Sequence, residues 1–182
     1  GTTGNPKGVM VQHDGLCNRF IWELSAYPKD TSDRLLQHMS LGFDYSSLEI
    51  FMALTAGACL VLADQDKRLD SAYIIRLIQE QKITIANFVP AQLRLFLDAP
   101  GVDQCRSLRL VFCSADVLDL RLQEQFFGKL NARLYNTYGP TEATIDVLHW
   151  ACNRGEALPV VPIGRPLANT QIYILNPRLQ PV

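Results

Sequence analysis

A chain of 182 residues has the length of one domain, for which the usual range is about 100–200 residues. Hydrophobic residues make up 48% of it and charged residues 19%, which excludes a disordered, collagen-like or low-complexity chain. The 17 basic and 18 acidic side chains give a net charge of -1, so the chain has no long-range field that would gather nucleic acid or an anionic membrane. We therefore expect neither among its partners.

The cysteines and the longest apolar runs favour a cytoplasmic protein. The five cysteines are odd in number, form no Cys-x-x-Cys pair and stand mostly among apolar residues, so we expect buried, reduced thiols. No apolar run approaches the roughly 20 residues of a membrane-spanning helix. Neither end of the sequence resembles a natural terminus, and we expect an internal fragment of one larger domain.

Helical spacing of apolar residues predicts helices over 15–25, 46–55, 71–81, 91–97 and 118–130. Short apolar runs predict strands over 58–62, 83–89, 108–113 and 133–138. Because strands that alternate with helices favour parallel βαβ units, the predicted fold class is α/β, with helices packed over a sheet. Beyond residue 150 prolines become frequent, and one alternating segment, 171–175, predicts a β element. We therefore predict an α/β core portion over 1–150 and the beginning of a β-rich subdomain over 151–182.

The opening residues, GTTGNPKG, combine three glycines, two threonines and one lysine. Such a loop offers backbone N–H groups, hydroxyl donors and a cation to an anion, and glycine allows the backbone to approach it closely. The loop is not a Walker loop, because Lys7 precedes the last glycine and no Ser or Thr follows it. Taken alone, the loop also fits a plain Gly-Pro turn.

Three further stretches share the character of sequence motifs: FDYSSLE at 43–49, YNTYGPTE at 135–142 and PIGRPLANT at 162–170. The opening loop and YNTYGPTE resemble the phosphate-loop and nucleotide motifs of the adenylate-forming superfamily. FDYSSLE and PIGRPLANT are similar to segments of one branch, the adenylation domains of nonribosomal peptide synthetases. The resemblance covers essentially the whole chain and implies part of the large N-terminal core of the adenylate-forming fold.

The resemblance implies an ATP-dependent amino-acid-activating ligase that converts an amino acid and ATP into aminoacyl-AMP and pyrophosphate. ATP and Mg²⁺ would be required. The aminoacyl group would then pass to the phosphopantetheine of a peptidyl carrier domain, next to a condensation domain of the parent synthetase. We expect the fragment alone to be inactive, because the family's ribose-binding aspartate and catalytic lysine would lie beyond Val182.

The resemblance also implies roles for individual residues. Thr2, Thr3, Gly4 and Lys7 would hold phosphates together with Thr141, and Glu142 would ligate Mg²⁺, since hard oxygen ligands suit that ion. The catalytic residues would be Lys7, Thr141 and Glu142. The residues implied around the adenine are Ala115, Asp116, Asn136, Tyr138 and Gly139. Ala115 departs from the family pattern, which more often has glycine there.

Asp44 would accept the α-ammonium group of the substrate, because a buried carboxylate needs an opposite charge beside it. The alternative for Asp44 alone is a helix cap. The specificity positions of the family fall on Tyr45, Leu48, Asn87, Phe112, Ser114, Thr137, Ile145 and Asp146. Asn87, Ser114, Thr137 and Asp146 would supply hydrogen-bonding groups, and the other four would supply apolar wall. Leaving the polar groups unpaired would cost about 1–3 kcal/mol each, which favours a small or medium polar side chain such as Ser, Thr, Cys or Gln.

Two other functions remain open at this stage. One is an acyl- or aryl-CoA ligase, which Asp44 and the NTYGPTE motif disfavour. The other is a catalytically inactive nucleotide-binding module, which the presence of Lys7, Thr141 and Glu142 disfavours. The three histidines, at 13, 38 and 149, are assigned no catalytic role.

Overall fold

The computed structural model describes residues 8–182, so the roles assigned to Thr2, Thr3, Gly4 and Lys7 lie outside the described residues. Its helices are α1 (His13–Ala26), α2 (Tyr45–Ala56), α3 (Ser71–Gln81), α4 (Pro90–Asp98) and α5 (Leu120–Lys129), with short 3-10 turns η1 (Val102–Gln104) and η2 (Thr141–Ala143). Its strands are β1 (Arg34–Gln37), β2 (Cys59–Leu62), β3 (Ile85–Phe88), β4 (Leu110–Cys113), β5 (Arg133–Tyr138), β6 (Leu148–Cys152) and β7 (Arg165–Pro166).

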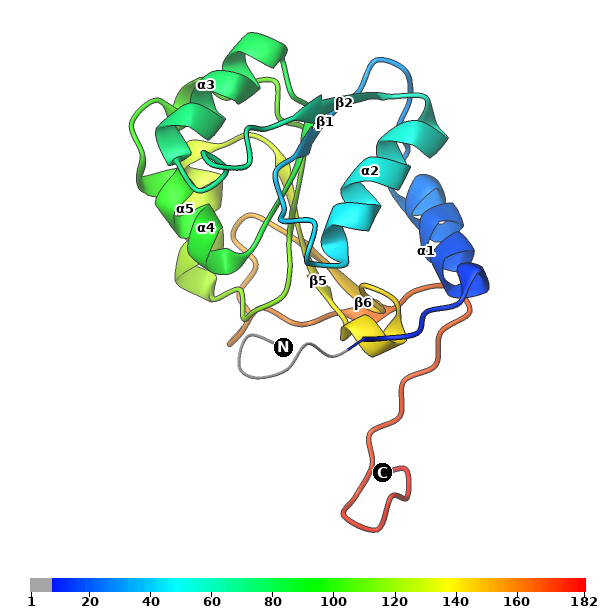
Figure 1. Cartoon of the computed structure of the whole chain (residues 1–182). Coiled ribbons are helices and arrows are strands. Elements are labelled where there is room, and N and C mark those ends of the chain that lie inside the picture. The colour runs from blue at the N-terminus through cyan, green and yellow to red at the C-terminus, as the bar shows by residue number, and fades with distance from the viewer. Residues whose placement is uncertain (1–7) are drawn as a thin grey trace.

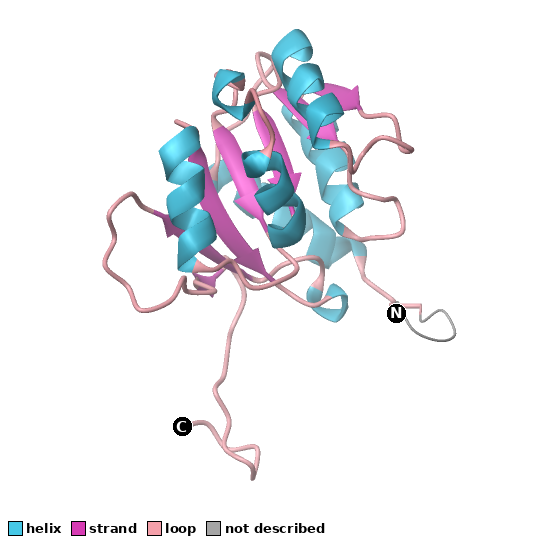
Figure 2. Cartoon of the chain, turned by 90° about the vertical axis from the view of Figure 1, so that its left-hand side faces the viewer, coloured by secondary structure: helices cyan, strands magenta, loops and turns pink. Residues whose placement is uncertain are grey.

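The strands form one seven-stranded sheet in the order β2-β1-β3-β4-β5-β6-β7. Strands β1 to β5 are parallel, whereas β6 and β7 are antiparallel to their neighbours. Helices α1 and α2 cover one face of the sheet, and α3, α4 and α5 cover the other (Figure 1). Figure 2 looks onto the second face, with the strands behind these helices. The predicted α/β class is confirmed, and the chain order reverses between β1 and β3, where such folds leave a crevice.

Alternating side chains of the parallel strands feed two separate cores. Leu36, Ala86 and Val111 point into the core beneath α3, α4 and α5. Leu35, Ile85 and Leu110 point the opposite way, toward Tyr45, Leu48 and Met52 of α2. Strands buried on both faces in this way have near-continuous apolar sequences, which is why short apolar runs identified them.

Helix ends explain why the predicted boundaries of some elements are accurate. Asp70 accepts hydrogen bonds from the backbone N–H groups of Ala72 and Tyr73 and so starts α3. Gly57 ends α2 in the left-handed conformation, with φ of 67°. Pro90 occupies the first turn of α4, where its missing N–H costs nothing.

Several sequence predictions are wrong in detail. Strands β1, β6 and β7 were not predicted, and residues 171–175 form no strand but extend away from the α/β body, with one isolated bridge between Leu175 and Pro181. Cys17 and Cys59 are exposed, although all five cysteines are free thiols as expected. Of the apolar residues that predicted α1, Ile21 is 70% exposed. Within the described residues, no helix is long and apolar enough to cross a membrane.

Candidate active site

A cavity of about 310 Å³ opens at the carboxyl ends of the parallel strands. The loops that follow β1, β3, β4 and β5 all reach it, and so does the start of α2. Its lining residues are Met39, Ser40, Phe43, Asp44, Tyr45, Arg68, Leu69, Val89, Gln92, Ser114, Ala115, Gly139, Ile145 and Asp146. Ligands of open α/β sheets bind in this position, outside the carboxyl ends of the strands at the point where the chain order reverses.

Asp44 stands at the N-cap position of α2 and lines this cavity. Its side chain makes no capping hydrogen bond, so the alternative of a helix cap is not supported. Nor does the carboxylate pair with any cation within residues 8–182. The positive end of the α2 dipole favours a negative charge there. The cavity therefore contains a half-buried carboxylate with unused hydrogen-bonding capacity.

The predicted side-chain pocket is only partly assembled around the cavity. Tyr45, Ser114, Ile145 and Asp146 line it. Leu48, Asn87, Phe112 and Thr137 are not among its lining residues and lie buried behind it. The structure therefore supports a smaller pocket than the sequence predicted.

Three of the four polar members of that pocket, Asn87, Thr137 and Asp146, already have partners. The Asn87 amide Nδ2 donates to Glu49 Oε1 at 3.4 Å. The hydroxyls of Tyr45 and Thr137 lie 3.4 Å apart, and Asp146 is paired with Arg19. The argument that an apolar substrate would leave these groups unpaired is therefore wrong for all of them except Ser114, and the preference for a polar side chain no longer follows from it.

A chain of four buried charges runs behind the pocket, and none of its contacts was predicted. Arg19 Nη2 donates to Asp146 Oδ2 at 3.1 Å, and Nε donates to Oδ1. Arg19 Nη2 also lies 2.7 Å from Glu23 Oε2, while Glu23 Oε1 accepts from Lys29 Nζ at 2.7 Å. Burial opposes the charge on Arg19, but the carboxylates of Asp146 and Glu23 raise its pKa above its ordinary value. The guanidinium therefore stays charged.

Glu49 is a second buried group that the sequence analysis missed. It is 1% exposed and accepts from the Met39 backbone N–H at 3.2 Å and from Gln37 Nε2 at 3.3 Å. Burial raises its pKa to about 8, although these hydrogen bonds and the one from Asn87 act in the opposite direction. Glu49 thus connects β1, β3 and α2 directly beneath the cavity. Its sequence signal is its place at the end of the FDYSSLE motif, five residues after Asp44.

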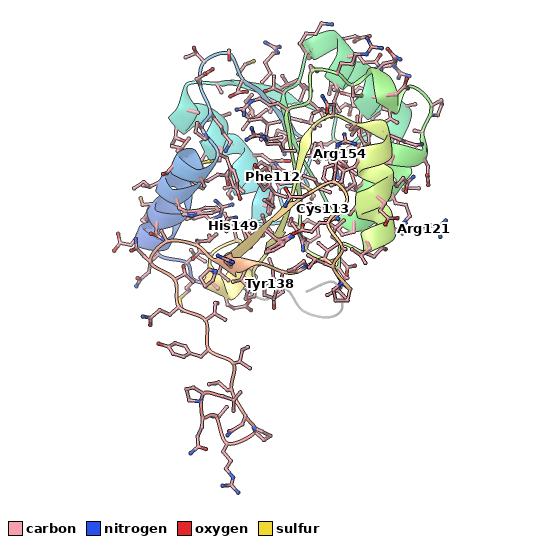
Figure 3. All side chains as sticks on the ribbon, turned by 180° about the vertical axis from the view of Figure 1, so that it is seen from behind. Phe112, Cys113, Arg121, Tyr138, His149 and Arg154 are labelled. Carbon is pink, nitrogen blue, oxygen red and sulfur yellow. The ribbon has the colours of Figure 1, made fainter. Side chains whose placement is uncertain are left out.

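The residues implied around the adenine lie at the ends of β4 and β5. Tyr138 is 49% exposed at the end of β5, while Phe112 and Cys113 lie inside the sheet (Figure 3). Asp116 is exposed beside Ala115, and the Asn136 amide donates to the Pro162 carbonyl at 2.8 Å. Tyr138 therefore offers an open ring face beside the cavity.

At positions 115 and 139 the backbone limits which residue fits. Ala115 has φ of 72°, a conformation that glycine adopts more easily, which explains the family's preference for glycine there. A Cβ atom on Gly139 would lie 2.3 Å from Asp146 Cα, so only glycine allows β5 and the loop before β6 to approach this closely. Thr144 and Ile145, next to the cavity, also have φ near 70°. Such strained β-branched residues tend to gather at functional sites.

A second hollow, of about 190 Å³, is lined by residues of motifs that lie far apart in the sequence. It is lined by Val9 and Val11, which follow the glycine-rich loop, and by Thr141, Thr144 and Asp44. Glu142, next to Thr141, is exposed and forms no ion pair within residues 8–182. Since Mg²⁺ is usually held by one or two carboxylates together with substrate phosphates, a free carboxylate here fits that ion.

The histidines have structural contacts. His38 is 1% exposed, and its Nε2 bonds the backbone carbonyl of Asn87. His149 Nδ1 lies 2.8 Å from the Tyr27 hydroxyl on the other side of the sheet. The third histidine, His13, is exposed at the start of α1.

The sequence matches the family described as "AMP-binding enzyme" over residues 1–182. The chain belongs to the AMP-binding enzyme family. Its predicted resemblance to adenylation domains of nonribosomal peptide synthetases is confirmed by its relatives and by solved structures.

Two relatives of this AMP-binding chain are synthetases. Tyrocidine synthase 3 of Brevibacillus parabrevis is 42% identical over 184 residues, which is 100% of this chain and 3% of that protein. Phosphinothricin tripeptide synthetase PhsB of Streptomyces viridochromogenes is 44% identical over 183 residues, 100% of this chain and 15% of that protein. Among solved structures, the Vibrio cholerae adenylation domain AlmE, in complex with glycyl-adenosine-5'-phosphate, has a TM-score of 0.88 and 30% identity. The match covers 99% of this chain and 34% of AlmE, so the chain spans a minor part of each relative.

Proposed function

We propose that the protein containing this chain activates an amino acid as its adenylate, with ATP as co-substrate and pyrophosphate as product. The observation that carries the proposal is the Asp44 carboxylate, which lines the cavity and neither caps α2 nor pairs with a cation in residues 8–182. An α-ammonium group supplies the missing opposite charge. The glycyl adenylate bound to AlmE supports the same chemistry.

In the proposed reaction the substrate carboxylate oxygen attacks the α-phosphorus of ATP, and the bond to the pyrophosphate oxygen breaks. Asp44 fixes the amino end of the substrate, so that its carboxylate points toward the ends of β4 and β5. Tyr138 stacks on the adenine, with Ala115, Asp116, Asn136 and Gly139 around it. Catalysis of this kind rests on positioning and electrostatic stabilisation, and needs no protein nucleophile.

The phosphates would contact Thr141 and the glycine-rich loop with Thr2, Thr3, Gly4 and Lys7. Bound Mg²⁺ would neutralise charge that develops on the phosphates, and Glu142 is the residue proposed to hold it. Val9 and Val11 share a hollow with Thr141, which supports the proposal that the two motifs act on the same group.

We further propose that the adenylate is passed to the phosphopantetheine thiol of a carrier domain, in a cytoplasmic synthetase that also has a condensation domain. The synthetases among the relatives and the five free thiols support this context. Residues 1–150 would then supply the nucleotide and amino-acid sites, and 151–182 would begin a β-rich subdomain.

ATP–pyrophosphate exchange by the full-length protein tests the proposal. We would measure exchange across a panel of amino acids, each paired with the acid that lacks its amino group. Exchange with one amino acid and none with its deaminated partner is expected. Exchange with deaminated acids would instead indicate an acyl- or aryl-CoA ligase, and no exchange by the folded protein would indicate an inactive nucleotide-binding module.

A further inference from the structure

We propose that Arg19 of α1 is a specificity-determining residue that neutralises Asp146 and thereby makes the pocket reject amino acids with cationic side chains. The inference rests on the proposed function, since it concerns the side chain of the amino acid bound by Asp44. Arg19 does not line the cavity, so it acts through Asp146 as a positioning residue.

Asp146 lines the cavity, but its negative charge is not available to a ligand there. Both carboxylate oxygens accept hydrogen bonds from the Arg19 guanidinium. A paired Arg–carboxylate fork of this kind directs its charge into the pair and holds both side chains in one geometry. A cationic substrate group would find Asp146 already neutralised.

A competing cation could not easily displace Arg19 from Asp146. It is 2% exposed and also lies 2.7 Å from Glu23 Oε2. Glu23 is held in turn by Lys29, whose side chain is completely buried. The guanidinium also lies over the Trp22 ring, 5.1 Å from its centre. The four charges of Asp146, Arg19, Glu23 and Lys29 cancel, so the network adds no net charge behind the pocket.

The remaining charges around the cavity also disfavour a second cation. Among the described residues, the charged side chains that line it are Asp44, Asp146 and Arg68. Asp44 has the α-ammonium group as its proposed partner, and Arg68 adds a cation to the lining of the cavity. A cationic side chain would thus lose its hydration and face a guanidinium without an available carboxylate.

The test compares ornithine with norvaline, which differ only in the side-chain ammonium group. ATP–pyrophosphate exchange is measured with the full-length protein as the ratio of kcat/KM for the two amino acids. The wild type is expected to favour norvaline. In Arg19→Gln, which leaves Asp146 unpaired, the ratio is expected to move toward ornithine by about tenfold or more, because one more unit charge acts in a desolvated site.

Two control variants separate specificity from structure. Arg19→Lys keeps the charge and is expected to keep the wild-type ratio. Arg94→Gln removes an arginine from an exposed ion pair with Asp119, at 2.7 Å, and is also expected to leave the ratio unchanged. A loss of stability alone would lower both kcat/KM values without moving their ratio.

If Arg19→Gln fails to fold, the double variant Arg19→Gln/Asp146→Asn removes both charges of the pair. It is expected to fold and to favour norvaline as the wild type does. A wild type that favours ornithine, a folded Arg19→Gln variant with an unchanged ratio, or a double variant whose ratio moves toward ornithine would overturn the inference. In each of these cases exchange by the wild type still supports the proposed function, whereas a wild type that exchanges with no amino acid contradicts both.

Discussion

Glu49 makes the stability of the protein depend on pH in a defined direction. Its pKa is about 8 in the folded protein against an ordinary value of 4.5. Between these pH values the unfolded chain releases a proton that the folded protein keeps, so the free energy of unfolding falls as pH rises. The stabilising contribution is fully present below about pH 4.5 and is lost as pH rises through about 8.

We therefore expect Glu49→Gln to become progressively more stable than the wild type between pH 5 and 8, by up to about 1.4 kcal/mol per pH unit. Urea denaturation of the full-length protein at several pH values measures the difference. His38, whose pKa burial lowers, affects both proteins alike and cancels. Glu124→Gln, at an exposed position of α5, is the control. The same pH dependence in the two variants would contradict the raised pKa of Glu49.

Gly139 lies so close to the backbone of Asp146 that no side chain fits at position 139. We expect Gly139→Ala to destabilise the protein by about 3 kcal/mol or more, because its Cβ would lie 2.3 Å from a backbone atom that cannot move aside. Gly128→Ala, in α5, meets no atom within 4 Å and should stabilise by about 0.5–1 kcal/mol. Thermal unfolding of both variants checks this pair, and equal effects would contradict the described approach of β5 to the loop before β6.

Arg19 and Glu23 show why part of the site could not be predicted from the sequence. Arg19 and Glu23 are charged residues four positions apart on a helix, a pattern that normally indicates a solvent-exposed face. Here both are buried, and Arg19 is paired with Asp146, 127 positions away in the chain. Nothing in the local sequence of α1 contains that information. Asp44, by contrast, was predicted because its motif is local.

Among the elements, α3 (Ser71–Gln81) was predicted to the residue from its regular apolar face, and the structure adds Asp70 as its N-cap. We expect Asp70→Ala to cost about 1 kcal/mol, since it removes the hydrogen bonds to Ala72 and Tyr73 that start the helix. Asp66→Ala, in the preceding loop, removes a side chain without a capping role and is the control. Urea denaturation measures both, and a similar loss in the two variants would contradict the capping role.

Strands β1 and β6 could not be predicted from their own residues. Strand β1 is only four residues long and reads RLLQ, and β6 reads LHWAC, so neither shows a clear apolar run or alternation. Both exist because neighbours pair with them: β1 lies between β2 and β3, and β6 runs antiparallel to β5. Sheet pairing is a tertiary interaction, and it overrides weak local preference.

At the scale of the whole molecule, the parallel strands bring distant motifs to one edge of the sheet. Asp44, Ser114 and Gly139 are separated by up to 95 positions in the chain, yet they line one cavity. The order of the motifs in the sequence indicated the family, but only the sheet order shows which of their residues meet. At this edge we propose that Asp44 recognises the amino acid.

The most direct measurement is the ratio of kcat/KM for the preferred amino acid to that for its deaminated partner, compared between wild type and Asp44→Asn. Removing one partner of a desolvated charge pair typically costs several kcal/mol, so the ratio should fall about a hundredfold or more in Asp44→Asn. Asp103→Asn, at an exposed position away from the cavity, should leave it unchanged. An equal ratio in wild type and Asp44→Asn would contradict the claim that Asp44 binds the α-ammonium group.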